Sequence, residues 1–384
     1  MGNDHPFVLN FKDKMKKNRT PIFMMITVGI ILGTILGLWT ASSNNVQGFS
    51  ILSVDTLLFM LLWAILATFL HELGHMLFGI MTGYKFVYFK LLNFMFFKKD
   101  NKWQIAHERT RGAIGQCIMR PDFKYHDKMP YMLYNAGGCI VNFVFALLCF
   151  VLIFAYGQNP FAIAGIVVNV VFVVINLVPS KTLGSDGYHM THIGKTNDNK
   201  RAYWLELNMM ADILHGKTFS DMPQHYFDFD AKDLYLEKVA SSLYMQYCYF
   251  VCTWQTQKAK DLITRLYENR SQMPLSNANT ICVEYFNHLM LFEDDKAKAI
   301  SVYNNFDTPV KNAIQRVPAP FALIAKILIN GISAHNDNLF NLDCMVMQKI
   351  IDFSKNLAET EYNNLLFRQA KIKYNSVDEN PFDM

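Results

Sequence analysis

Long runs without a charged residue dominate the first half of this 384-residue chain and favour a membrane protein. Residues 21–41 and 129–180 carry no charge, and residues 56–81 are interrupted only by three ionisable side chains. A helix needs about 20 apolar residues to cross a hydrocarbon core. The polar segment 156–160 is a natural turn within the longest run. We therefore expect four transmembrane helices, at 21–41, 56–81, 131–156 and 161–179.

The start of the chain has two possible interpretations. Small residues at 41–43 fit the end of a cleaved signal peptide. The apolar run before them is longer than a signal peptide requires, so an uncleaved anchor is the preferred interpretation.

Net charge and cysteine usage limit the partners and the compartment that the chain can have. A net charge of +4 without a basic stripe predicts no nucleic-acid partner, and seven scattered cysteines without a CxxC pair indicate free thiols in a reducing cytoplasm.

The charge of the connecting loops predicts the orientation. Residues 83–130 hold ten Lys or Arg against four acidic residues, whereas residues 42–50 and 157–160 hold no charge. Cytoplasmic loops carry the excess of positive charge. We expect a multi-pass protein of the cell membrane with both termini and residues 83–130 in the cytoplasm.

Residues 84–97 are aromatic and β-branched with partial alternation, which is typical of strands. We expect a small β element at the membrane surface, because a strand in contact with lipid must have its backbone paired. One edge of these strands is expected to hold an extended substrate. The segment Gly115-Gln116-Cys117 or His107 could lie near a functional site, but a buried thiol and a surface histidine are the preferred interpretations.

A short motif in the second apolar run carries the chemistry. His71, Glu72 and His75 form HExxH, and histidines four apart lie on one face of a helix, so both imidazoles can reach one ion. Ionisable residues inside a membrane helix are costly and mark functional sites. Zinc with three protein ligands lowers the pKa of its bound water to about 7, and Glu72 is the candidate base that activates this water.

A second motif follows the last span, where Asn176, Pro179, Asp186 and Gly187 form Asn-x-x-Pro…Asp-Gly. With HExxH in an earlier span, the chain resembles the site-2 proteases, zinc enzymes that cleave peptide bonds within or beside membranes. The resemblance implies that His71, His75 and Asp186 bind Zn²⁺ and that Glu72 is the base. Six residues separate Pro179 from Asp186, against four in the common family form, so His189 and His192 are alternative ligands.

The resemblance also covers Gly137–Asn142, which is similar to a small-residue motif of the family. It implies that Asn142 and Asn176 lie near the metal, where an amide can hold the substrate or the oxyanion. A prenyl-protein endoprotease is disfavoured, because the later spans contain no glutamate. Residues 83–130 are too short for a PDZ domain.

The second half of the chain has helical apolar spacing. Similar segments begin at Lys258 and Lys296, and residues 339–357 look like a further copy. They are similar to tetratricopeptide-type hairpins, and an unrelated helical bundle is an equal alternative. The expected organisation is a basic N-terminus (1–20), a protease core (21–190), a connector (191–230) and a cytoplasmic helical domain (231–384).

Together these features predict an α-helical polytopic membrane protein with a small β element and a cytoplasmic all-α domain. Its expected activity is zinc-dependent hydrolysis of a peptide bond in a membrane-associated protein or peptide. The alternative is an inactive relative that acts as a membrane-anchored peptide-binding or regulatory protein. An intact Glu72 argues against this alternative, because binding alone requires no general base.

Overall fold

A computed structural model describes residues 54–99, 102–107, 114–157, 159–181, 184–316 and 319–378. The chain divides into two compact units, residues 1–200 and 201–384, and each is described by itself. The boundary between them falls inside the predicted connector. The basic N-terminus and the predicted span at 21–41 lie outside the described residues.

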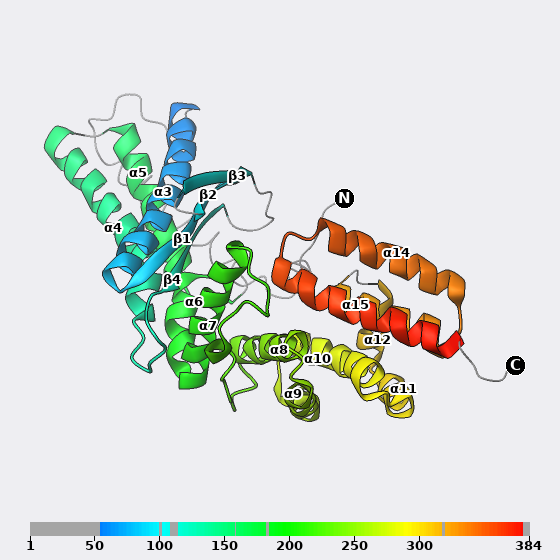
Figure 1. Cartoon of the computed structure of the whole chain (residues 1–384). Helices are drawn as coiled ribbons and strands as arrows, with labels where there is room; N and C mark the ends of the chain where they lie inside the picture. Colours follow the sequence, from blue (N-terminus) through cyan, green and yellow to red (C-terminus); the bar gives the residue numbers. More distant parts are fainter. Residues whose placement is uncertain are drawn as a thin grey trace, which may run out of the picture. The chain divides into compact units, whose positions relative to one another are not determined.

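Three helices of the first unit are long and apolar enough to cross a membrane: α3 (Val54–Met81), α4 (Tyr131–Tyr156) and α5 (Pro160–Leu177). They pack against one another as a bundle (Figure 1). Large apolar side chains on their outer faces are exposed, including those of Leu61, Phe143 and Phe150. The outward apolar face is what a lipid environment requires, because lipid offers no penalty to these side chains. Three of the predicted spans are confirmed as apolar helices.

Local sequence accounts for the turn between α4 and α5. α4 ends at Gly157, whose φ of 84° lies in the left-handed region that favours glycine. α5 begins with Asn159 as its N-cap, whose side chain accepts a hydrogen bond from the backbone N–H of Phe161 at 2.8 Å. Pro160 occupies the first helical position, where its missing N–H costs nothing. Trp63 of α3 then donates to the Phe161 carbonyl at 2.8 Å and joins the helices at this end.

An antiparallel sheet of four strands lies against α3. The strands are β1 (Tyr84–Leu91), β2 (Phe94–Lys99), β3 (Lys102–His107) and β4 (Gly115–Pro121), in the order β3-β2-β1-β4. β1 and β4 contact α3, and the Phe69 and Phe89 rings meet edge to face at 5.5 Å. The predicted β element is confirmed. The expectation that residues 84–97 offer a free edge is wrong, because these residues form the two interior strands, each paired on both sides.

Two further helices complete the path to the second unit. α6 (Asp186–His192) follows the end of α5 after a loop, and its N-terminus contacts α4 and α5. A 3₁₀ turn at Ile193–Lys195 leads into α7 (Asn197–Leu214), which continues into residues of the second unit.

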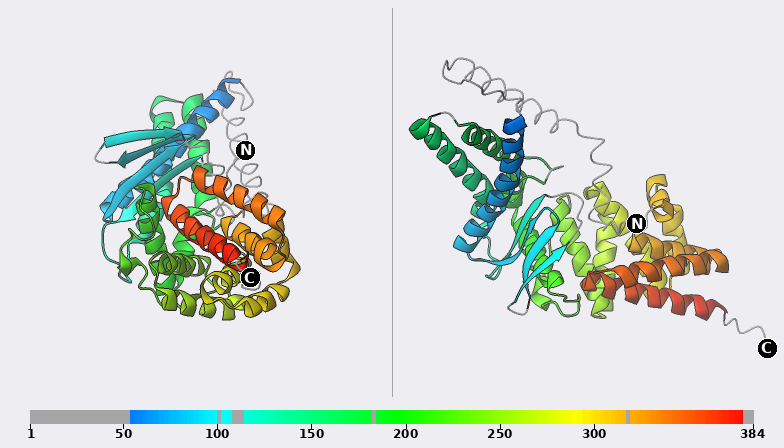
Figure 2. Two further views of the ribbon diagram at one scale, coloured as in Figure 1. Left: turned by 45° about the vertical axis from the view of Figure 1, so that its right-hand side comes forward. Right: turned by 90° about the horizontal axis from the view of Figure 1, so that it is seen from above.

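Helices are the regular secondary structure in the described part of the second unit (Figure 2). Its helices are α8 (Glu237–Cys252), α9 (Thr256–Glu268), α10 (Leu275–His288), α11 (Lys296–Asn304), α12 (Thr308–Arg316), α13 (Pro320–Leu328), α14 (Asp337–Phe353) and α15 (Leu357–Asp378). Short 3₁₀ or π segments lie at Gln224–Tyr226, Arg270–Gln272, Leu289–Glu293 and Ile329–Ser333. The segments that begin at Lys258 and Lys296 are helical, as expected. Their relation to tetratricopeptide repeats stays a prediction.

Candidate metal centre

The two histidines of the HExxH motif project from one face of α3 into the helix bundle. Both are buried, and their Nε2 atoms lie 3.2 Å apart. A helix rises 1.5 Å per residue, so His75 and His71 lie about 9 and 15 Å inside the end of α3 at Met81. The motif therefore places both imidazoles within the apolar length of the helix and well away from its terminus.

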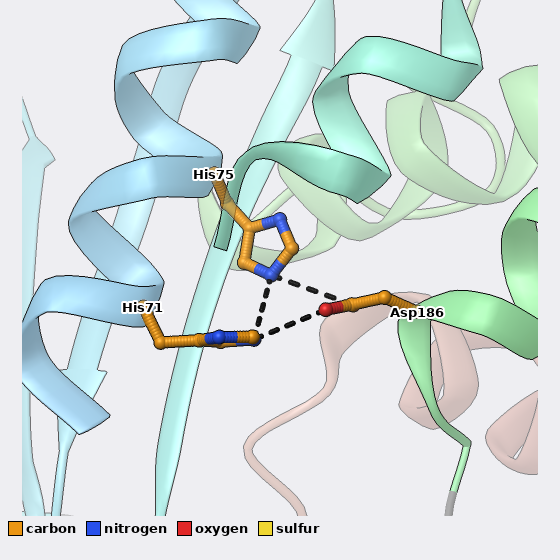
Figure 3. Close-up of side chains that lie close together, drawn as sticks. All are labelled: His71, His75 and Asp186. Atoms are coloured by element: carbon orange, nitrogen blue, oxygen red, sulfur yellow. Dashed lines mark hydrogen bonds and ion pairs between the residues drawn. The ribbon is translucent and has the colours of Figure 1, made fainter. Parts of the chain in front are cut away.

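Asp186 approaches the histidines from the first turn of α6 (Figure 3). Its Oδ2 lies 3.1 Å from Nε2 of His71, and its Oδ1 lies 3.4 Å from Nε2 of His75. The following glycine is required by packing, because a Cβ atom on Gly187 would lie 2.0 Å from the carbonyl oxygen of Leu177. The Asp-Gly pair thus lets the start of α6 press against the end of α5 and brings the carboxylate to the histidines.

The loop between Pro179 and Asp186 is closed at its base by one serine. The Ser185 hydroxyl accepts from the backbone N–H of Ser180 at 2.9 Å and donates to the carbonyl of Val178 at 2.7 Å. Its backbone N–H donates to the Ser180 carbonyl at 3.2 Å. Ser185 also caps α6 by accepting from Tyr188. These hydrogen bonds bring the chain back to the end of α5, so the longer spacing does not displace Asp186 from the histidines.

The candidate ligand atoms, two imidazole nitrogens and the two oxygens of one carboxylate, are spaced about as tetrahedral zinc requires. Zinc bonds to nitrogen and carboxylate oxygen are about 2.0–2.2 Å long, which places tetrahedral ligands about 3.3 Å from one another. The three observed separations are 3.2, 3.1 and 3.4 Å. His71, His75 and Asp186 are also the one group of metal-ligating side chains of this kind among the described residues. They can therefore hold a metal ion.

When both imidazoles are neutral, the hydrogen bonds behind the histidines leave both Nε2 atoms as acceptors. His75 Nδ1 lies 2.8 Å from the carbonyl oxygen of Tyr134, which can only accept, so Nδ1 carries a proton. His71 Nδ1 lies 2.7 Å from Oδ1 of Asn142, whose Nδ2 donates to the Ala67 carbonyl at 3.1 Å. Two Nε2 lone pairs and a carboxylate then converge on one point. Such a set of buried acceptors is stabilised by a cation.

Asn142 therefore orients His71 in this structure. It is fully buried, and its Nδ2 also donates to Oδ1 of Asn169 at 2.8 Å. Asn169 in turn donates to the Gly165 carbonyl at 2.8 Å, which fixes the direction of its amide. Asn169 was not among the predicted site residues. The signal that could have identified it is an asparagine within an uncharged apolar span, where a polar side chain is unusual. The predicted contact of Asn142 with substrate stays a prediction.

Glycine also makes room for His71. A Cβ atom on Gly138 would lie 2.5 Å from Cε1 of the His71 ring, so the imidazole occupies the space that a side chain on α4 would fill. Cys139, the next residue, places its Sγ 3.7 Å from Oδ2 of Asp186. The small-residue motif that opens α4 is thus part of the wall of the site.

Glu72 is buried beside the triad and contacts the edge strand β4. Its carboxylate accepts a hydrogen bond from the backbone N–H of Cys117. A Cβ atom on Gly115 would lie 2.8 Å from Oε1 of Glu72. The predicted buried thiol is confirmed, and the segment also lies beside Glu72, which was the less favoured alternative. The Cys117 thiol is buried, and burial followed by the charge of Glu72 raises its pKa, but its backbone belongs to the site.

The other sequence candidates lie elsewhere or have local partners. Neither His189 nor His192 joins the group of His71, His75 and Asp186 found among the described residues, and the His192 ring stacks on Tyr188 at 4.0 Å. Asn176 donates to the Phe172 carbonyl at 3.0 Å within α5, and its contact with substrate stays a prediction. His107 is exposed on β3, beside Phe94.

The charge state of Asp186 suits a metal ligand. Burial raises the pKa of this carboxyl, but the positive charge of a protonated His75 and hydrogen bonds donated by His71 and His75 lower it, and the net shift is downward. The carboxylate is therefore ionised at neutral pH.

Comparison with known proteins agrees with this centre. The family model for peptidase family M50 matches residues 58–346. No curated protein and no solved structure matches the chain. The match begins in α3, includes both motifs and ends in α14, over more than half of the chain. The chain therefore belongs to peptidase family M50, the site-2 protease family of membrane metallopeptidases.

Proposed function

We propose that this protein is an intramembrane zinc protease that hydrolyses a peptide bond in a membrane-associated protein or peptide. The observation that carries the proposal is the close grouping of His71, His75 and Asp186. The two Nε2 atoms lie 3.2 Å apart and 3.1 and 3.4 Å from the two carboxylate oxygens, which is close to the ligand spacing of a tetrahedral zinc site. This group lies inside an apolar helix bundle in a member of a metallopeptidase family. Zinc is favoured because two neutral imidazoles and one carboxylate are a catalytic zinc set that leaves one position open.

Zinc bound there would supply Lewis acidity, both to the attacking water and to the scissile carbonyl. Glu72 is placed to handle the proton. Its carboxylate is buried next to the triad and can take a proton from the attacking water, then deliver it to the leaving nitrogen. Asn142 and the Tyr134 carbonyl hold the two imidazoles in one tautomer and one orientation. No other acidic residue of the described spans is near enough to share this role, since Glu72 is the one Asp or Glu between Leu57 and Met81 and α4 and α5 have none.

For topology, we propose that both termini and residues 83–130 face the cytoplasm and that the metal lies toward that side. The loop charges support this orientation. The catalytic end of α3 is the end that leads into the sheet, and the first turns of α4 and the end of α5 lie at the same end. A substrate would therefore reach the metal from the cytoplasmic half of the membrane.

The second candidate function is that of an inactive relative that binds peptides. The mainly helical second unit, with its tetratricopeptide-like segments, is the feature that favours it. Glu72 argues for catalysis, because the structure holds its carboxylate at the triad by a backbone hydrogen bond. The two functions differ in whether the wild type cleaves peptides and in whether loss of the Glu72 carboxylate abolishes that cleavage.

The test uses purified full-length protein in detergent micelles. Zinc content is measured by mass spectrometry, and cleavage is followed with a fluorogenic peptide that carries a membrane-spanning segment between fluorophore and quencher. The wild type should hold one zinc ion per chain and cut the peptide, whereas His71→Ala should lose both properties. A wild type that binds zinc but releases no product would favour the binding protein.

A further inference from the structure

Cys117 of β4 is tied to two membrane helices through both of its backbone polar groups. Its carbonyl accepts a hydrogen bond from the hydroxyl of Tyr134 at 3.0 Å. Its N–H donates to the carboxylate of Glu72. In an antiparallel strand the N–H and C=O of one residue point to the same side, so both groups of Cys117 face away from β1 and toward the metal centre.

Tyr134 also contacts the metal centre through its own backbone. Its carbonyl accepts from Nδ1 of His75 at 2.8 Å, while its side chain reaches β4. The residue is buried, and its ring stacks on that of Tyr84 with centroids 5.0 Å apart and an interplanar angle of 19°. One residue of α4 thus links a candidate zinc ligand, the edge strand and, through Cys117, the candidate base.

We propose that Tyr134 is a positioning residue for the general base. Its hydroxyl fixes the Cys117 carbonyl, and the rigid peptide backbone then aims the Cys117 N–H at Glu72. This inference rests on the proposed function and adds a residue that acts through another. The physical need is clear: a buried carboxylate without a donor is unstable, and a base must be held to within about 0.5 Å of its productive position.

Gly115, on the same strand as Cys117, supports this arrangement by letting β4 approach Glu72. A Cβ atom there would lie 2.8 Å from Oε1 of Glu72 and 2.6 Å from Cγ2 of Thr68. Both separations are too short for ordinary contact, and Thr68 and Glu72 lie on α3, one turn apart. β4 can approach Glu72 closely enough for the Cys117 hydrogen bond only because residue 115 has no side chain.

The arrangement also restricts how a substrate can use β4. An extended peptide that paired with β4 at Cys117 would need the two backbone groups that Tyr134 and Glu72 now occupy. Such pairing would displace the Tyr134 hydroxyl and release Glu72. The proposal therefore requires that the Tyr134 contact persists during turnover and that the substrate binds without using Cys117.

The test compares Tyr134→Phe with Tyr84→Phe in the full-length protein. The two rings stack on each other, but the buried Tyr84 hydroxyl has no hydrogen-bond partner among the described residues. Tyr134→Phe should lower kcat about tenfold, equivalent to about 1.4 kcal/mol, with KM and zinc content unchanged. Tyr84→Phe should stay within about twofold of the wild type. Hydrogen exchange of the peptide that contains β4 should be faster in Tyr134→Phe alone.

Gly115→Ala is the second variant, because it disturbs the same contact without touching α4. It should keep zinc and lose more activity than Tyr134→Phe, since its Cβ pushes the Glu72 side chain directly. Two results would overturn the proposal: a Tyr134→Phe enzyme with unchanged or raised kcat, or one that loses zinc. If Glu72→Gln also retained full activity, the proposed function itself would fail, whereas an inactive Glu72→Gln beside a fully active Tyr134→Phe would reject only the role of Tyr134.

Discussion

The two units of this protein each bury a cluster of carboxylate and histidine side chains, and the two clusters have opposite surroundings. In the second unit, Glu284 and His288 lie four residues apart on α10 and both are buried. Hydroxyl groups surround the carboxylate: Tyr244 donates to its Oε1 at 2.7 Å and Tyr362 to its Oε2 at 2.9 Å. Asn287 donates to it as well, at 3.3 Å.

In the first unit the buried groups at the centre are acceptors. The Nδ1 protons of His71 and His75 are directed away to Asn142 and Tyr134, so both Nε2 lone pairs face the carboxylate of Asp186. Burial alone therefore does not identify a functional carboxylate. A carboxylate that is matched by hydrogen-bond donors joins three helices of the second unit, whereas a cluster of acceptors can bind a cation.

The sharpest contrast between the two units is the effect of neutralising each carboxylate. Glu72→Gln should lower cleavage about 10³-fold and leave zinc bound, because a general base contributes roughly 10²–10⁴ in rate and Glu72 is not a ligand. Glu284→Gln should leave cleavage within about twofold, since an amide can still bond to Tyr244 and Tyr362. The fluorogenic membrane peptide measures both variants. Loss of cleavage in Glu284→Gln would mean that the second unit takes part in the reaction.

His288 should make the stability of the second unit depend on pH. Burial lowers the pKa of His288 from 6.5 to about 4, against a weaker opposing effect of Glu293. Between these values the unfolded chain binds more protons, so the contribution of His288 is complete above pH 6.5 and is lost as the pH falls toward 4. A shift of this size corresponds to up to about 3 kcal/mol.

Thermal unfolding of the full-length protein at pH 7 and pH 5 measures this effect. His288→Gln should reduce the difference between the two conditions. Burial raises the pKa of Glu284, whose contribution therefore has the opposite sign, but that contribution is common to both proteins and cancels in the comparison. An equal pH dependence in the variant would show that His288 is not protonated on unfolding.

In the first unit, the asparagines behind His71 should act on the metal. Asn142→Leu should weaken zinc binding roughly 10–100-fold, the usual effect of losing a group that orients a ligand. Asn169→Leu should have the same direction and a smaller size, because it acts through Asn142. Competition with a zinc chelator gives the affinities. If the two variants bind zinc as tightly as the wild type, the orientation of His71 does not depend on this pair.

The smallest expected effect concerns the loop before Asp186. Ser185→Ala removes the hydroxyl that bonds to Ser180 and Val178, and we expect a loss of zinc affinity of about threefold to tenfold. Ser180→Ala is the matched control, since Ser185 bonds to the backbone of Ser180. Equal affinities of the two variants would show that the loop is held in another way.

The sequence was sufficient for the parts of the site that lie within one element. HExxH fixes two imidazoles on α3. Asp186, on α6, was expected only from the resemblance to the site-2 proteases, with His189 and His192 as alternatives. The sequence was insufficient for partners that meet across elements. Asn169, Tyr134 and the Cys117 backbone come from α5, α4 and β4, and no local spacing links them to α3. The order of the strands was missed for the same reason, because alternation predicts a strand and does not say which strand lies at an edge.

The zinc content of three proteins, the wild type, Asp186→Ala and His189→Ala, shows whether Asp186 is the third metal ligand. The wild type and His189→Ala should each hold one zinc ion per chain after purification, because Asp186 and not His189 completes the group with His71 and His75. Asp186→Ala should retain little zinc. A zinc-loaded Asp186→Ala protein beside a zinc-free His189→Ala protein would contradict the account and move the third ligand to the next turn of α6.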